Sequence, residues 1–322
     1  MIEPIYLDIS ELDGSHDNVH IDVPIMDTIR MYLGFNNITA DRCRCEYNRT
    51  LDCYDIFFGN CHDVDLRKYS FTKKVTMLII QSRINKHNIN LSFLENLNRL
   101  IIGYDYNGEL NILTFPDAIE ELIIQINRTT VGIKFPSNLK KLKFGTYYTC
   151  SLVGVNFPIG LITLEMGSIK SLVDVKLPVS LQKIIIKSPE VMTTINDITL
   201  PYTITSLELN YGIRYDTEII NVPSNFTDVT IHNPYLLDKL AFPYSIKTLR
   251  FMETSQSLNN LPNNIEELYI ENVYDSVTNL PSSLTKIITK YMTKSNVESK
   301  FKRLPYGCIV TNDEGVILLS QH

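Results

Sequence analysis

The stretch Leu261–Ile270, LPNNIEELYI, decides the fold because its ten-residue pattern occurs nine times in the 322-residue sequence. Each copy has a proline preceded by Leu, Phe or Val, and apolar residues third, sixth and eighth after that proline, except for Thr289 in the last copy. The other eight copies begin at Phe115, Phe135, Phe157, Leu177, Leu200, Val222, Phe242 and Leu280. A pattern that returns at a fixed period is the signature of a repeat protein, so we interpret the chain as stacked turns.

Two earlier copies lack the proline: one is built on Leu78 and Ile80, and the next on Leu100 and Ile102. With these two, eleven turns begin between residues 72 and 281 at spacings of 19 to 23 residues. That spacing lies at the short end of the leucine-rich-repeat range. A weaker copy spans residues 48–56. The pattern decays towards the C-terminus, where Pro305 is not followed by the apolar triplet.

Each copy is expected to form a strand followed by a return segment. Proline fixes its own backbone angle and favours an extended residue before it, which suits a corner leading into a strand. The alternation then points Leu268 and Ile270 inward and Tyr269 outward. A second apolar line, such as Val153 and Val155, predicts a return segment that turns sharply and has no room for a full helix. The predicted fold is a β-rich, leucine-rich-repeat-like solenoid with a parallel sheet of about eleven rungs.

We expect three regions: an N-terminal cap over residues 1–68, the solenoid over residues 69–292, and a C-terminal cap over residues 293–322. In the first region a short amphipathic helix is predicted between Pro24 and Gly34, with an F-box as the sharper alternative.

The C-terminal cap is expected to hold a short helix and a hairpin. Ser295 and Glu298 have the spacing of a helix capping box. The segment after Cys308 predicts a hairpin with its turn at Asn312–Gly315.

Composition excludes several classes of function. With 30 basic and 36 acidic residues the formal net charge is -6, so the basic patch of a nucleic-acid-binding protein is not expected. No segment approaches the roughly 20 apolar residues of a membrane helix, and the start carries no signal-peptide pattern. Sequence motifs of hydrolases, metalloproteases and nucleotide-binding enzymes are missing from the sequence. We therefore expect a soluble intracellular protein that is not an enzyme and has no cofactor.

Four cysteines cluster ahead of the clear repeats, at Cys43, Cys45, Cys53 and Cys61, with His62 beside the last. Free thiols are the favoured interpretation for an intracellular protein. One or two disulfides in a cap are an alternative. Zinc is a weaker one because Cys43 and Cys45 are separated by one residue instead of the usual two, so no metal site is predicted.

Two nearly intact copies, LPSSLTKII from Leu280 and LPVSLQKII from Leu177, resemble the FNIP repeat. This relative of the leucine-rich repeat is found in social amoebae and in giant viruses of amoebae, and the resemblance covers about residues 70 to 290. The pattern is also similar to the short repeats of bacterial leucine-rich effectors. Both resemblances imply protein binding and do not imply an enzyme. Asn127 is the one candidate for the asparagine ladder of ordinary leucine-rich repeats.

A partner would meet the outward strand positions, where acidic and basic turns alternate. Glu120 and Glu121 are expected to face Lys140 and Lys141 across neighbouring strands, and Lys247 to face Glu266, which gives these charges a structural use. Apolar residues at outward positions are better candidates for contact. The predicted partner-binding residues are Ile123, Lys143, Ile185, Arg250 and Tyr269.

The leading hypothesis is a non-catalytic scaffold that presents its sheet to a protein partner in the cytoplasm, which would be the host cytoplasm for a viral protein. A structural role in a virion or homo-oligomer, through self-association, is the alternative. A substrate-binding adaptor of a ubiquitin ligase is a narrower variant.

Overall fold

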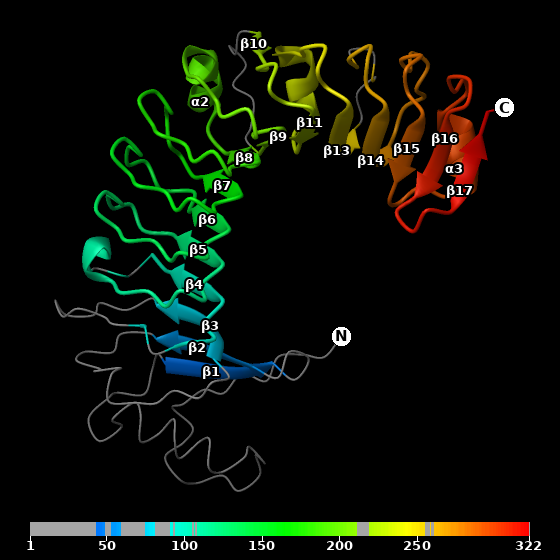
Figure 1. Ribbon diagram of the computed structural model, residues 1–322. Helices are drawn as coiled ribbons and strands as arrows, with labels where there is room; N and C mark the ends of the chain where they lie inside the picture. Colours follow the sequence, from blue (N-terminus) through cyan, green and yellow to red (C-terminus); the bar gives the residue numbers. More distant parts are fainter. Residues whose placement is uncertain are drawn as a thin grey trace, which may run out of the picture. The chain divides into compact units, whose positions relative to one another are not determined.

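The computed structural model describes residues 43–48, 53–58, 75–80, 91–92, 94–104, 106, 108–210, 219–254, 258 and 261–321. The chain divides into two compact units, residues 1–161 and 162–322. The boundary between the units falls inside the repeat region, and the cap boundaries at residues 68 and 293 stay predictions. In each unit the strands of successive turns lie side by side, with the return segments behind them (Figure 1).

Within its described residues the first unit holds six strands in chain order, and all neighbours after the antiparallel pair β1–β2 are parallel. The strands are β1 (Cys43–Asn48), β2 (Cys53–Phe58), β3 (Val75–Ile80), β4 (Arg99–Ile102), β5 (Glu121–Ile124) and β6 (Lys141–Phe144).

The second unit holds nine strands of its sheet among the residues described, and only the last pair is antiparallel. They are β7 (Thr163–Met166), β8 (Lys183–Ile186), β9 (Ser206–Leu209), β11 (Asp228–Ile231), β13 (Thr248–Thr254), β14 (Glu267–Val273), β15 (Lys286–Thr289), β16 (Ile309–Asn312) and β17 (Ile317–Ser320). A separate pair of short parallel strands, β10 (Ile220–Asn221) and β12 (Leu240–Ala241), lies in the return segments.

Each of the eleven predicted turns contributes one strand to the large sheet, from β3 in the turn that begins at residue 72 to β15 in the turn that begins at residue 281. The chain is therefore a β-rich solenoid of the leucine-rich-repeat type, as predicted. Two further strands extend the array. One is β2, from the weak copy at residues 48–56, and the other is β16, which follows Pro305.

The segment after Pro305 adds a strand to the parallel sheet although the apolar triplet is missing there. Cys308 takes the buried third position with 0% exposure, and Val310 pairs with Ile287 one residue earlier than the pattern predicts. Because a thiol takes the third position and the strand begins one residue sooner after the proline, the periodicity hides this turn in the sequence.

Stacking in register creates the core of each unit. In the second unit the sixth position of every turn up to β15, together with Val310 of β16, is fully buried in one continuous row. The residues of this row, all 0% exposed, are Leu164, Ile184, Leu207, Val229, Leu249, Leu268, Ile287 and Val310. No single turn could bury these side chains alone, so each turn depends on its neighbours.

The return segments turn more sharply than the sequence indicates. The amide of Val155 donates to the carbonyl of Leu152 at 3.1 Å, and Gly154 between them has φ +80°. Leu152 is therefore buried, whereas Val153 of the expected apolar line is 47% exposed. The next turn repeats this with Asp174 at φ 62°.

Short helices lie in some of the return segments among the described residues. They are α2 (Pro189–Thr194) and the 3-10 helices η3 (Leu110–Ile112), η4 (Ile195–Asp197) and η5 (Pro234–Lys239). None approaches a full helix, in agreement with the predicted lack of room.

The residue two positions after proline has a role that the sequence analysis missed. Its polar side chain donates to a backbone carbonyl of the preceding turn: Thr203 to Val179 at 2.7 Å, and Ser245 to Phe226 at 2.7 Å. Ser283 continues the series. These hydrogen bonds explain the serine of the LPxSL pattern, because they join neighbouring turns where the strands begin.

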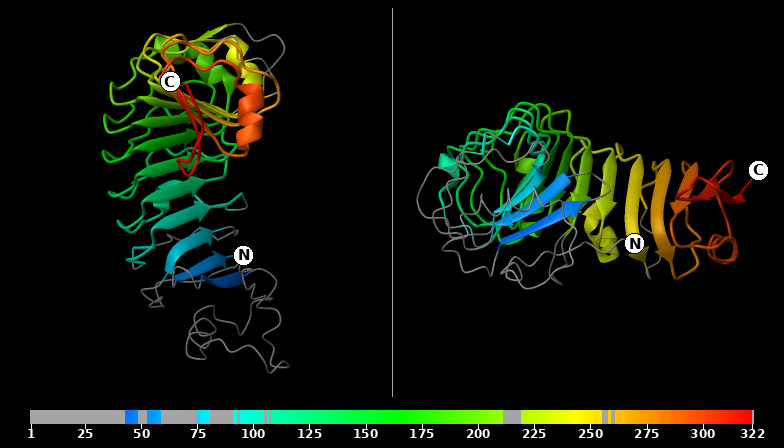
Figure 2. Two further views of the ribbon diagram at one scale, coloured as in Figure 1. Left: turned by 90° about the vertical axis from the view of Figure 1, so that its right-hand side faces the viewer. Right: turned by 90° about the horizontal axis from the view of Figure 1, so that it is seen from below.

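The last turns end in a helix and a hairpin. Helix α3 (Lys294–Lys300) contacts β17, and both lie at the C-terminal end of the second unit (Figure 2). Its N-cap is Thr293, whose hydroxyl accepts from the amide of Asn296 at 3.3 Å, so the capping box predicted at Ser295 was wrong by two residues. The turn at Asn312–Gly315 is confirmed by a 3.1 Å hydrogen bond between its ends.

The predicted helix between residues 24 and 34, and the F-box alternative for that segment, lie outside the described residues. Within the described part of the chain, no helix has the length and apolar character needed to cross a membrane.

Replacing a mid-array core residue should be more damaging than replacing one at the end. Leu207→Asp places a charge between Ile184 and Val229, and we expect a loss of at least about 3 kcal/mol in the free energy of unfolding. Val310→Asp, in the last parallel strand, should cost less, and Tyr202→Asp, at an 84% exposed position, should have little effect. Circular dichroism and thermal melting measure this, and equal losses at Leu207 and Val310 would contradict nearest-neighbour stacking.

The hydrogen bonds between turns can be tested at one serine pair. The Ser283 hydroxyl lies 2.8 Å from the carbonyl of Asn263 and 2.7 Å from that of Ile265, whereas Ser282 is exposed. Ser283→Ala should lower the free energy of unfolding by about 1 kcal/mol in urea titrations, and Ser282→Ala should leave it nearly unchanged. Identical unfolding midpoints for the two variants would show that the ladder does not stabilise the array.

Candidate functional site

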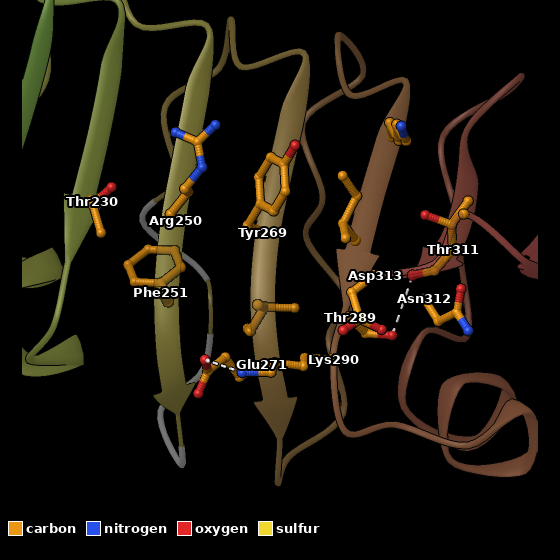
Figure 3. A pocket seen from close by; sticks show the side chains of 14 residues that line it. Thr230, Arg250, Phe251, Tyr269, Glu271, Thr289, Lys290, Thr311, Asn312 and Asp313 are labelled. Atoms are coloured by element: carbon orange, nitrogen blue, oxygen red, sulfur yellow. Dashed lines mark hydrogen bonds and ion pairs between the residues drawn. The ribbon is translucent and has the colours of Figure 1, made fainter. Parts of the chain in front are cut away.

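The outward face of the last strands of the second unit contains a hollow with a volume of about 430 Å³. Its centre is one row of side chains in register across five strands, β11 to β16. The row consists of Thr230, Arg250, Tyr269, Ile288 and Thr311 (Figure 3). We name this feature the C-terminal hollow, and define it by this row together with Lys286, Glu271, Lys290 and Asp313 on its rims.

Arg250 and Tyr269 form one side of the hollow as a contacting pair. The guanidinium of Arg250 forms an ion pair with Asp228 and lies 4.4 Å from the centre of the Tyr269 ring. Burial by itself lowers the pKa of Arg250, but hydrogen bonds to Asp228 and Tyr269 outweigh it and leave the pKa above its ordinary value. The arginine is therefore held in place, and it orients the tyrosine ring beside it.

The rim of the hollow at the ends of the strands carries opposite charges. The ammonium of Lys290 is 3.8 Å from the carboxylate of Glu271 and 4.9 Å from the centre of the Tyr291 ring. Asp313 follows β16 in the hairpin turn at the same edge. These groups largely satisfy one another.

The opposite wall contains two buried threonines. Thr289 occupies a core position with 0% exposure, and its hydroxyl donates to the carbonyl of Thr311 at 3.3 Å. Thr311 itself is 3% exposed, and its hydroxyl has no hydrogen-bond partner among the residues that the structure describes. A buried polar group without a partner is costly, so Thr311 is the unusual residue of the hollow.

Lys286 lies two residues before Ile288 on β15. In register its neighbours are Glu267 on β14 and Ile309 on β16. The structure records neither an ion pair nor a hydrogen bond of the Lys286 side chain with any described residue. This ammonium group therefore remains available at the edge of the hollow.

A second charged cluster lies on β8, β9 and the end of β11. The Glu208 carboxylate is 2.5 Å from the Lys183 ammonium and 2.8 Å from the Nε2 atom of His232. Burial raises the pKa of Glu208, but hydrogen bonds from Lys183 and His232 lower it by more, so the pKa falls below its ordinary value of 4.5.

Two of the five predicted site residues are not exposed as expected, and their role in partner binding stays a prediction. Ile123 is 5% exposed and Ile185 is 8% exposed, so both are buried although they occupy outward positions. Side chains on the neighbouring strands cover them. Ile123 lies in register between Ile101 and Lys143 on β4 and β6.

Ile185 is covered in the same way, because it lies in register between Glu165 and Glu208 on β7 and β9. Both glutamates are drawn into ion pairs, and Glu165 lies 2.5 Å from the Lys187 ammonium. Residue type and alternation do not reveal such cover, because it depends on the length and pairing of side chains one turn away.

The remaining predicted residues are placed as follows. Arg250 and Tyr269 meet in the C-terminal hollow, whereas Lys143 lies on β6 of the first unit. Two of the predicted charge pairs are confirmed, by ion pairs of Glu121 with Lys141 at 3.0 Å and of Lys247 with Glu266 at 2.6 Å, whereas the pairing of Glu120 with Lys140 stays a prediction.

Asn127 bonds to the next turn as well, since its side chain accepts from the amide of Thr149 at 2.9 Å. The sequence analysis missed Thr311 because the repeat pattern weakens after Pro305, and it missed Lys286 and Ile288 although both lie at outward positions of the nearly intact copy from Leu280. The proline at Pro305, with a buried cysteine three residues later, was the available signal.

The cysteines have the following positions. Cys43 and Cys45 lie on β1 opposite Phe58 and Ile56, and Cys53 lies on β2 opposite Asn48, so none of these three is the register partner of another. Cys61 and His62 lie outside the described residues, and the state of these thiols stays a prediction.

Cys150 and Cys308 are free thiols, and burial raises the pKa of Cys308 to about 11. A search of the described residues finds no group of three or more His, Cys, Asp or Glu side chains arranged to hold a metal ion.

Comparison with known proteins finds solved structures but no matching family model and no matching curated protein sequence. The circular leucine-rich-repeat protein CroV588 aligns over 83% of this chain and 50% of its own length, with 18% identity and a TM-score of 0.43. YopM from Yersinia enterocolitica aligns over 75% of this chain and 52% of its own length, with 16% identity and a TM-score of 0.35. A leucine-rich repeat protein from Bacteroides ovatus aligns over 86% of this chain and 100% of its own length, with 9% identity and a TM-score of 0.18. The chain spans about half the length of the first two.

The Glu208 cluster predicts a pH dependence of stability. Because the pKa of this carboxyl group is lowered on folding, its contribution is present above pH 4.5 and is lost as the pH falls through the folded pKa. Glu208→Gln should therefore destabilise the chain near neutral pH and flatten the loss of stability on acidification. Glu314→Gln, which removes the same charge from an exposed position, is the control. Urea unfolding over a pH series measures this, and parallel profiles for the wild type and Glu208→Gln would contradict it.

Proposed function

We propose that the chain is a non-catalytic scaffold that binds a protein partner through the C-terminal hollow. The observation that carries this proposal is the buried, unpartnered hydroxyl of Thr311 in a hollow lined mainly by apolar surface. Solvent-facing sheet positions need no such cavity for stability. A hollow of this size is within the range of about 300 to 1,000 Å³ that ligand sites occupy.

The composition of the hollow agrees with a protein contact. Tyrosine and arginine are enriched among the residues that dominate binding energy at protein interfaces. Arg250 and Tyr269 are already held against each other, so little side-chain entropy remains to be lost on binding. The preorganised pair favours recognition of a defined partner over adventitious adhesion.

The finer assignment rests on the repeat itself. The resemblance of LPSSLTKII to the FNIP repeat suggests a protein of social amoebae or of their giant viruses, acting in the cytoplasm of the cell. This assignment supports protein binding and gives no residue a catalytic role. A role as a ubiquitin-ligase adaptor depends on residues 1–68 and is refuted by failure to retain any ligase subunit.

A structural role in an assembly is the second candidate, and one observation favours it. Strand β17 ends the sheet of the second unit, and Val316 and Ile317 beside its start are 54% and 59% exposed. No charged residue occurs between Gly315 and Gln321 to discourage pairing with another strand. Self-association through this edge would place the chain in a homo-oligomer or a virion.

The proposed function is tested by pull-down from the cell that makes the chain, with Tyr269→Ala compared with Tyr244→Ala. Tyr244 is 84% exposed and lies outside the hollow, so it controls for loss of a surface tyrosine. We expect capture of a defined protein by the wild type and by Tyr244→Ala, and a loss of roughly tenfold or more with Tyr269→Ala.

Equal capture by the two variants would refute binding through the hollow. Light scattering separates the two candidates. A monomer that captures a partner supports the scaffold, and concentration-dependent self-association without a partner supports the assembly.

A further inference from the structure

Two groups of the C-terminal hollow that lack a partner among the described residues, Lys286 and Thr311, are hydrogen-bond donors. Lys286 carries an ammonium group that forms no ion pair with a described residue, and the Thr311 hydroxyl is buried without a partner. The other two cations of the hollow are occupied, Arg250 by Asp228 and Lys290 by Glu271. A ligand that completes this site must therefore supply acceptors: an anion for Lys286 and a neutral acceptor for Thr311.

The spacing of these groups matches an extended peptide. Lys286 and Ile288 are two residues apart on one strand, so their side chains leave the sheet roughly 6.6 Å apart. Alternate side chains of an extended ligand have the same spacing. Thr311 lies in register with Ile288 on the adjacent strand, about 4.8 Å away, where it can reach the backbone of such a ligand.

The surface between these groups is apolar. Ile288 is half-buried, and the ring of Tyr269 lies in register with it on the other side. In Figure 3 Tyr269 and Thr311 come from the strands that flank β15 on either side. An apolar ligand side chain placed over Ile288 would therefore contact the tyrosine ring and remove part of it from water.

We propose that the hollow binds an extended segment of a partner protein that carries an acidic residue and, two positions away, an apolar residue. The acidic side chain pairs with Lys286, the apolar side chain packs on Ile288 and Tyr269, and a backbone carbonyl of the segment accepts from Thr311. This inference rests on the proposed function and deepens it by naming the chemistry of the partner.

Glu267 refines the specificity. It is the register neighbour of Lys286 on β14 and forms no ion pair with it. A ligand carboxylate at Lys286 is therefore attracted by the lysine and repelled by this glutamate, which limits the site to a single negative charge. Removing the glutamate charge should strengthen binding, whereas removing the lysine charge should weaken it.

The experiment selects a phage-displayed library of random short peptides on the full chain. The wild type should enrich peptides with Asp or Glu two positions from an aliphatic or aromatic residue. Lys286→Glu should instead enrich Lys or Arg at the acidic position. Lys294→Glu, an exposed lysine on α3 outside the hollow, is the matched control and should select the same peptides as the wild type.

A selected peptide then measures the individual contacts by fluorescence polarisation. Thr311→Val should weaken its binding about fivefold, although loss of an unpartnered buried hydroxyl should not lower the melting temperature. Lys286→Gln should weaken binding roughly tenfold, and Glu267→Gln should strengthen it. Binding that falls only together with the melting temperature would overturn the role of Thr311.

The inference is overturned by a library that yields no acidic preference, or by the same peptides from the wild type and Lys286→Glu. Its failure is distinct from failure of the proposed function. Selection of neutral peptides, with partner capture still abolished by Tyr269→Ala, would keep the scaffold and remove the acidic segment. Capture that is unaffected by Tyr269→Ala would remove the scaffold itself.

Discussion

Both units depend on one constraint. Their strands stack in register, so that each residue lies beside its counterpart in the next turn. Turns of unequal length keep that register because the residue three positions after each proline donates its amide to the proline carbonyl, as Leu181 does to Pro178 at 3.1 Å. This hydrogen-bonded turn brings the chain to the same position before every strand. Extra residues are absorbed in the return segments, where α2 lies in the longest spacing, so insertions do not shift the core row.

The same repetition explains why so much of the fold follows from the sequence. Leu207 and Leu268 occupy equivalent positions, and an apolar residue needed in every turn leaves a period that survives degeneration of any one copy. Position Pro305 shows the limit of this argument. A strand that begins one residue sooner after its proline, with Cys308 in place of leucine, satisfies the packing and breaks the pattern.

The candidate site was less predictable because exposure is a property of neighbouring turns. Ile185 and Tyr269 occupy the same outward position in their turns, yet Ile185 is covered by glutamates held in ion pairs, whereas Tyr269 lines an open hollow. Covering depends on the reach of side chains about 4.8 Å away on adjacent strands, which a single turn does not encode. Outward residues that lie in register on adjacent strands, considered together as one row, predict part of this burial.

At the end of the array, the requirement for apolar residues at core positions is weaker. A middle strand is packed on both sides, so a polar residue in its core position would be destabilising. Near the last parallel strand the core row includes Thr289, and the outward row ends in Thr311, whose hydroxyl is left without a partner. Hydrogen bonding to Thr311 explains why Thr289 is tolerated, but nothing within the described fold compensates Thr311. A cost retained in the lining of a hollow is understandable when a ligand supplies the missing bond, and for this reason the hollow, more than the charged rows of the sheet, is the place to look for function.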